Sequence, residues 1–187
     1  MLILQLYLFF GLIFHKVIWE VLKHRSAEKP VETASVKLKM IKAVKILILL
    51  AVIVQIWIPD LPPILSDPFW LRTLGVLLFT LGLATAVSAR FELGDNWANI
   101  ETGQVLRRQN VVETGIYGCV RHPIYAGDLL LLLGLELALN SWLVCGILLL
   151  APVVTLQAMK EEQMLAEALP GYEQYCRRSK RFIPFIF

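Results

Sequence analysis

The apolar stretch from residue 124 to residue 159 constrains this chain more than any other feature, because it is too long for one membrane span. A helix of about 20 apolar residues already crosses a lipid bilayer. Asn140 and Ser141 lie near the middle of the stretch and are suited to a tight turn. The stretch therefore predicts a helical hairpin made of two membrane-spanning helices.

Three earlier apolar stretches, at about residues 2–21, 43–58 and 73–89, are each candidates for one further span. The chain is 57% hydrophobic and only 18% charged, whereas a soluble domain has about 45–50% apolar and about 25% charged residues. This composition excludes a disordered chain and argues against an ordinary soluble domain. We expect an all-α integral membrane protein with five transmembrane helices in a single domain, 1–187. A four-span arrangement with one interfacial segment is the alternative.

Basic residues occur in alternate loops, which predicts how the chain is oriented in the membrane. Segments 22–42, 90–123 and 160–187 are basic, whereas the loop at 59–70 contains no lysine or arginine. Because loops rich in lysine and arginine stay in the cytoplasm, the N-terminus is expected outside and the C-terminus in the cytoplasm. The two long polar segments, 90–123 and 160–187, would then meet on the cytoplasmic side. The basic residues concerned are Lys23, Arg25, Lys29, Lys37, Lys39, Lys42, Arg90, Arg107, Arg108, Arg121, Lys160, Arg177, Arg178, Lys180 and Arg181.

The first polar segment ends in Arg121-His122-Pro123, directly before the apolar stretch. Proline is favoured in the first turn of a helix, so Pro123 predicts a helix start with His122 near the N-cap. A helix N-terminus attracts anionic groups, and Arg121 can bind a carboxylate with two parallel hydrogen bonds. A basic cap at the membrane interface is an equally good interpretation of these residues.

Two acidic residues, Asp128 and Glu136, fall inside the predicted hairpin and share roughly one helix face. Ionisable groups at membrane depth are costly and usually face a partner or a cavity. Placement near the helix N-terminus accounts for Asp128. For Glu136 the sequence leaves two alternatives of equal weight, a partner or cavity in the interior and the outer interface.

The second polar segment begins with Glu161 and Glu162, where the last span leaves the bilayer. The helical apolar pattern continues to 169 and is stopped by Pro170-Gly171. Tyrosines and arginines follow, which is typical of an interfacial anchor. The alternative is half of a binding site, with acids for a cation or a ribose diol and an arginine for a carboxylate or phosphate.

Several common functional signatures are missing from the sequence. There is no glycine-rich dinucleotide motif, phosphate-binding loop, zinc-protease motif or nucleophile elbow. No metal site follows from the spacing of His15, His24 and His122. The net charge is +3, and the basic residues lie beside the membrane spans rather than on a separate basic face. Nucleic acid is therefore not an expected partner. Nothing indicates an obligate protein partner.

Within 90–187 the sequence resembles the membrane methyltransferases that include isoprenylcysteine carboxyl methyltransferases and phospholipid N-methyltransferases. The first two predicted spans contain no motif of that family. The resembling segments are Leu93–Trp97, Val112–Tyr117, Arg121–Gly127, Glu161–Glu162, Gly171–Tyr175 and Arg181–Pro184.

The resemblance implies that S-adenosylmethionine donates the methyl group from a cytoplasmic pocket that the C-terminal segment closes. The acceptor would be a prenylcysteine carboxylate or a phospholipid amine, reaching the site from the membrane lipids. Arg178 or Arg181 would serve this acceptor, and Glu162 or Asp128 would help to deprotonate an amine. The residues implied to bind the cofactor are Arg121, His122, Pro123, Tyr125, Glu161, Glu162 and Tyr172.

Segments Arg121–Asp128, Tyr172–Cys176 and Ile183–Pro184 are also similar to the C-terminal half of membrane sterol reductases. Those enzymes use NADPH to reduce an isoprenoid double bond. Their chains are typically much longer and contain additional spans, so the methyltransferase interpretation is favoured.

Overall fold

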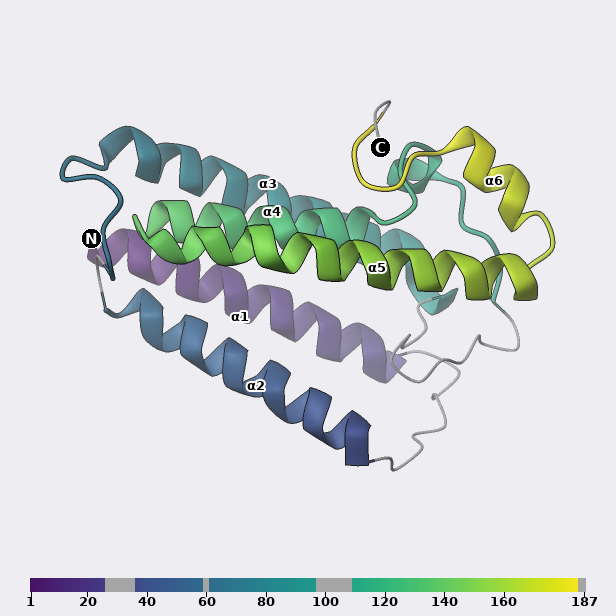
Figure 1. The fold of residues 1–187 in the computed structure, drawn as a ribbon, viewed down its shortest axis with the longest axis horizontal. Helices are drawn as coiled ribbons and strands as arrows, with labels where there is room; N and C mark the ends of the chain where they lie inside the picture. The colour runs from purple at the N-terminus through teal and green to yellow at the C-terminus, as the bar shows by residue number, and fades with distance from the viewer. Residues whose placement is uncertain (26–35, 59–60, 97–108, 185–187) are drawn as a thin grey trace.

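The structure, a computed structural model, describes residues 1–25, 36–58, 61–96 and 109–184. These residues form helices without any strand, which confirms the predicted all-α class. In Figure 1 the helices α1 to α5 lie along one another, and α6 lies at one end. Trp97, Lys29, Arg107 and Arg108 of the sequence analysis lie outside the described residues. The helices are α1 (Leu2–Arg25), α2 (Val36–Ile56), α3 (Phe69–Leu93), α4 (Pro123–Ala138), α5 (Cys145–Ala168) and α6 (Tyr172–Arg178), with the short 3-10 helices η1 (Gly94–Asn96), η3 (Gly115–Gly118) and η4 (Trp142–Val144).

Within the described part of the chain, three helical segments are long and apolar enough to cross a membrane: Leu2–His24, Phe69–Asn96 and Trp142–Ala168. The helix α4 has 16 residues, fewer than the roughly 20 that a perpendicular span requires. The turn at Asn140 and Ser141 is where the sequence predicts it, and Asn140 adopts a left-handed backbone with a φ of 56°. The helices α4 and α5 run in opposite directions from this turn (Figure 1).

Glycines bring α3 and α4 into backbone contact, and this is the most extensive helix pairing in the described structure. A Cβ atom at Gly75 or Gly82 of α3 would collide with backbone nitrogens of α4. A Cβ atom at Gly134 of α4 would collide in the same way with the backbone of α3. Small residues allow such close packing between membrane helices, where burial of apolar surface provides little drive. The α3–α4 pair is therefore the central unit of the fold, and α1 packs against α3 while α5 packs against α4.

The structure places Glu136 in the interior, which decides between the two alternatives that the sequence leaves open for this residue. Its side chain lies between α4 and α2, where Gln55 donates a hydrogen bond of 2.7 Å to Oε2. The residue is only 6% exposed. Asp128 has a different partner, His15 of α1, so the two acids do not share one environment. Each acidic side chain is hydrogen-bonded to a polar residue on a neighbouring helix.

Candidate functional site

The two polar segments meet at one end of the helices, as the sequence predicts, and their backbones are hydrogen-bonded. The Arg121 N–H donates to the carbonyl of Lys180 at 2.7 Å, and the His122 N–H donates to Arg181 at 3.0 Å. The N–H of Lys180 donates in turn to Cys119 at 3.0 Å. The C-terminal segment is therefore fixed directly beside the start of α4, where His122 is the N-cap and Pro123 lies in the first turn.

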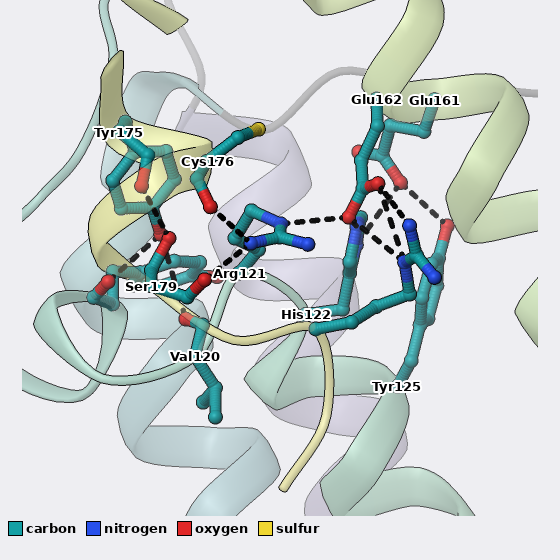
Figure 2. Close-up of polar contacts among 11 residues, drawn as sticks. Val120, Arg121, His122, Tyr125, Glu161, Glu162, Tyr175, Cys176 and Ser179 are labelled. Atoms are coloured by element: carbon teal, nitrogen blue, oxygen red, sulfur yellow. Dashed lines mark hydrogen bonds and ion pairs between the residues drawn. The ribbon is translucent and has the colours of Figure 1, made fainter. Parts of the chain in front are cut away.

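Glu162 of α5 is the centre of a group of polar side chains, here called the Glu162 cluster, whose other members are Arg121, His122 and Arg181. Oε1 of Glu162 accepts a hydrogen bond of 2.8 Å from Nε of Arg121 and lies 3.1 Å from Nε2 of His122 (Figure 2). Arg181 binds the same carboxylate with both Nε and Nη2, the latter at 2.7 Å. The side chains of Glu162 and Arg121 are only 12% and 10% exposed. The hydrogen bond to Glu162 raises the pKa of Arg181, so this guanidinium stays charged.

Arg121 also holds the end of α6 through its second guanidinium nitrogen. Nη1 donates to the backbone carbonyls of Cys176, at 3.0 Å, and Ser179 (Figure 2). The hydroxyl of Tyr175 donates across to the carbonyl of Tyr117 at 2.8 Å. These bonds tie α6 to the segment that precedes α4. One arginine thus joins α4, α5 and the C-terminal segment.

A pocket opens beside the Glu162 cluster, and it contains about 710 Å³ of open space with its mouth included. Pro123 is fully buried, and Glu162 lies in the cluster without lining the pocket. The residues of the sequence-based site that line it are Arg121, His122, Tyr125, Glu161 and Tyr172.

The pocket wall combines tyrosine rings with one carboxylate. The Tyr125 hydroxyl donates to Oε2 of Glu161 at 3.1 Å, and the Tyr125 ring is parallel to that of His122 with centroids 5.4 Å apart. Burial raises the pKa values of Tyr117 and Tyr172 well above their ordinary range. These hydroxyls are therefore uncharged hydrogen-bonding groups at neutral pH. Among the described residues, no three His, Cys, Asp or Glu side chains are grouped as metal ligands would be.

Neither arginine that the resemblance assigns to the acceptor lines the pocket. Arg181 is held in the Glu162 cluster. Arg178 forms a 3.0 Å ion pair with Glu113 at the surface, where the two side chains are 66% and 39% exposed. In the sequence, Arg178 and Arg181 lie in the same basic segment. In the fold they have different partners, Glu113 for Arg178 and Glu162 for Arg181.

Other pocket residues escaped the sequence analysis. Leu165 of α5 and Leu169, the C-cap residue of that helix, continue its apolar pattern, which indicates burial but did not point to a pocket. Asn96 lies within Leu93–Trp97, a segment that carries the family resemblance but was given no role in the pocket, and its Oδ1 accepts the backbone N–H of Asn110 at 2.7 Å. Nothing in the sequence singles out Asn110 itself.

A structural comparison shows what this fold is similar to. The eukaryotic intramembrane Ras methyltransferase, an isoprenylcysteine carboxyl methyltransferase, superposes with a TM-score of 0.53 at 24% sequence identity. The superposition covers 63% of this chain and 43% of that one. At this identity the comparison establishes a shared fold.

Two curated proteins are similar in sequence. The cobalt-zinc-cadmium resistance protein of Cupriavidus metallidurans is 32% identical over 121 residues, which are 63% of this chain and 53% of that protein. The Delta(14)-sterol reductase of Mus musculus is 30% identical over 101 residues, or 48% of this chain and 23% of the reductase. The match spans about half the length of the first relative and about a quarter of the second.

The family comparison covers the part of the chain that supplies most of the pocket. The family model described as phospholipid methyltransferase matches residues 70–170, a range that includes α3 except its first residue, the whole of α4, and Glu161 and Glu162 of α5. Because this match extends over more than half of the chain, the protein belongs to the phospholipid methyltransferase family.

Proposed function

We propose that this protein transfers a methyl group from S-adenosylmethionine to a lipid-like amphiphilic acceptor at the cytoplasmic membrane face. The observation that carries the proposal is the pocket of tyrosines and Glu161, which Arg121 and His122 of the Glu162 cluster line at the start of α4. Membership of the phospholipid methyltransferase family supports the reaction class.

The residues of the pocket suit S-adenosylmethionine, which carries a positively charged sulfonium group. Aromatic faces and a carboxylate attract such a cation, and Tyr125, Tyr172 and Glu161 supply both. Nη2 of Arg121 has no partner among the described residues, although Nε and Nη1 are bonded. We assign this nitrogen to the carboxylate of the methionine moiety, and Glu161 to its ammonium group or to the ribose hydroxyls.

Bound S-adenosylmethionine supplies a methyl group that is already activated, so the protein mainly has to align donor and acceptor and exclude water. Both oxygens of Glu162 are occupied by cationic side chains. We therefore assign Glu162 a positioning role, in which it holds Arg121 and His122 at the pocket wall. Arg181 supports the same carboxylate from the C-terminal segment.

The membrane arrangement belongs to the same proposal. Five transmembrane helices, with the N-terminus outside, would place the pocket at the cytoplasmic surface. Three apolar helical segments and the shared fold with an intramembrane enzyme support membrane insertion. The acceptor would enter laterally from the lipid, as either a prenylcysteine carboxylate or a phospholipid amine.

Reduction of an isoprenoid double bond by NADPH is the second candidate, favoured by the similarity to the sterol reductase. That similarity covers less than half of this chain and about a quarter of the reductase. The family match, in contrast, includes the whole pocket side of α4 and α5. Methyl transfer is therefore the better supported of the two reactions.

The proposal is tested by incubating the purified protein in lipid nanodiscs with S-adenosylmethionine labelled in the methyl group. Lipid amines and prenylated cysteine derivatives serve as the acceptor panel. We expect label to appear in at least one acceptor class. If well-folded protein transfers no label to any member of the panel, the proposed function is wrong.

Substitution Glu161→Gln should weaken binding of S-adenosylhomocysteine by about tenfold, as expected for the loss of a charge-assisted hydrogen bond. Tyr125→Phe should have a smaller effect, because it removes only a neutral donor from the same carboxylate. Titration calorimetry measures both affinities. Equal affinities for Glu161→Gln and the unaltered protein would remove Glu161 from the binding site.

Arg178→Gln should raise the KM for the acceptor severalfold and leave the affinity for S-adenosylhomocysteine unchanged, because the side chain lies outside the pocket and is 66% exposed. Steady-state kinetics with varied acceptor concentration measure the effect. An unchanged KM and kcat would show that Arg178 does not serve the acceptor.

A further inference from the structure

A histidine and an aspartate from distant parts of the chain form a pair beside the pocket. Nε2 of His15 on α1 lies 3.0 Å from Oδ1 of Asp128 on α4. The ring of Trp19 stacks on that of His15, with centroids 4.1 Å apart and an interplanar angle of 23°. The stacking and the hydrogen bond together fix the orientation of the imidazole.

The pair lies one helical turn deeper along α4 than the pocket. Ile124 and Tyr125 both line the pocket, and Asp128 follows them by four and three residues. Helix geometry therefore places Asp128 about 5 Å further along the axis and within about 60° of both around the helix. An acceptor that reaches the pocket from the lipid along α4 would pass this pair.

The pair is accessible from outside the protein, although it lies among apolar surface. The side chains of His15 and Asp128 are 21% and 40% exposed. The neighbouring α1 residues Phe14 and Val17 are both 50% exposed, which is typical of a surface facing lipid. Ionisable side chains at membrane depth are costly and usually have a functional role.

One carboxylate oxygen of Asp128 has no hydrogen-bond partner among the described residues. Oδ1 is bonded to His15, whereas Oδ2 has no partner among the described residues. The nearby cation of α1, Lys16, pairs with Glu20 on its own helix at 3.0 Å. The pair therefore presents a carboxylate oxygen that can accept a hydrogen bond from a ligand.

From this geometry we infer that His15 and Asp128 bind the ammonium group of an amine acceptor and remove its proton. The inference rests on the proposed function and selects an amine over a carboxylate acceptor. Asp128 would repel a carboxylate, which in addition needs no base. An ammonium group must lose a proton before its nitrogen can attack a methyl group.

The proton transfer and the methyl transfer balance. An N–H bond of the acceptor breaks, and the proton passes to Oδ2 of Asp128, while His15 donates to Oδ1 in the tautomer protonated at Nε2. The freed lone pair forms the new N–C bond, and the electrons of the breaking C–S bond remain on sulfur. The products are the methylated amine and the demethylated thioether.

The test compares Asp128→Asn and His15→Gln with two acceptors in nanodiscs. One is a phospholipid with a primary amine head group, and the other is the same lipid with an aminooxy head group, which is uncharged at neutral pH. We expect Asp128→Asn to lower kcat/KM for the amine by about a hundredfold, within the range of general-base effects, and His15→Gln by less. Both variants should methylate the aminooxy lipid at nearly the unaltered rate.

A matched control and a readout without cofactor complete the experiment. Glu20→Gln, which removes an exposed carboxylate from the same helix as His15, should behave like the unaltered protein with both lipids. Without cofactor, Asp128→Asn should bind a short-chain phosphoethanolamine about tenfold more weakly, because a charge-assisted hydrogen bond is lost.

Equal losses with both lipids, or unchanged binding of the phosphoethanolamine, would show that the pair only joins α1 to α4. The inference would then be wrong, whereas retained binding of S-adenosylhomocysteine would leave the proposed function intact. Failure of the unaltered protein to bind S-adenosylhomocysteine would instead count against the proposed function itself.

Discussion

Replacing Glu162 with alanine will abolish measurable binding of S-adenosylhomocysteine and destabilise the protein by about 3 kcal/mol or more. Glu162 is 12% exposed and accepts hydrogen bonds from two arginines and contacts one histidine. Removing it leaves Arg121 and Arg181 close together without their shared counter-charge. Because Arg121 also holds α6, the loss extends to the wall of the pocket.

Two variants make this result specific to the Glu162 cluster. Glu162→Gln keeps the size of the side chain but removes its charge, so it should also lose most of the binding. Glu167→Gln removes an exposed carboxylate from the same helix, and it should resemble the unaltered protein. The measurements are calorimetric affinity and the midpoint of thermal unfolding in detergent. If Glu162→Ala matches Glu167→Gln in both, the cluster does not organise the site.

Replacing Gly134 with alanine will separate α3 from α4 and prevent stable folding. The added Cβ would collide with the backbone nitrogen of Phe79, and backbone cannot move aside as a flexible side chain can. Overpacking in a core typically costs about 1–3 kcal/mol, and more where the surroundings cannot relax. The helices also position the site, since Glu92 of α3 accepts the backbone N–H of Ile116 at 2.9 Å. Binding of S-adenosylhomocysteine should therefore fall together with stability.

Gly146 of α5 provides the matched control, because no atom lies within 4 Å of a Cβ built there. Gly146→Ala should be neutral or stabilising, as alanine is favoured over glycine in a helix by about 1 kcal/mol. Thermal unfolding in detergent compares the two variants. Similar unfolding midpoints for Gly134→Ala and Gly146→Ala would contradict the close packing of α3 and α4.

The features that the sequence predicts correctly are those determined by local chemistry. Pro123 marks the start of α4 and His122 its N-cap, because proline needs no hydrogen-bond partner in the first turn. The helix α5 ends at Ala168 with Leu169 as its C-cap, directly before Pro170-Gly171, as predicted. The alternation of basic loops also predicted that segments far apart in the chain meet at one end of the helices.

The pairing between helices could not be predicted in the same way. In a membrane protein a helix is apolar on all sides, so no amphipathic face shows which side packs inward. For this reason the sequence does not decide whether Glu136 faces the interior or the outer interface, and it does not identify the partner of Asp128. Gly127 and Gly134, like Gly75 and Gly82, are seven residues apart, a spacing that marks the contact between α3 and α4 once the two helices are known to pair.

The choice between Arg178 and Arg181 depends on geometry that a basic segment does not reveal. Arg178 is the last residue of α6, and Arg181 follows it by three positions. The backbone bonds between the C-terminal segment and the start of α4 direct Arg181 toward Glu162. Arg178 remains at the end of α6 and reaches Glu113 instead.

The central claim is that the pocket beside the Glu162 cluster binds S-adenosylmethionine. Titration calorimetry of the detergent-purified protein with S-adenosylhomocysteine, and separately with NADPH, tests this claim without any knowledge of the acceptor. The account predicts saturable binding of S-adenosylhomocysteine, weakened by Glu161→Gln, and no binding of NADPH. Saturable binding of NADPH without binding of S-adenosylhomocysteine would contradict it.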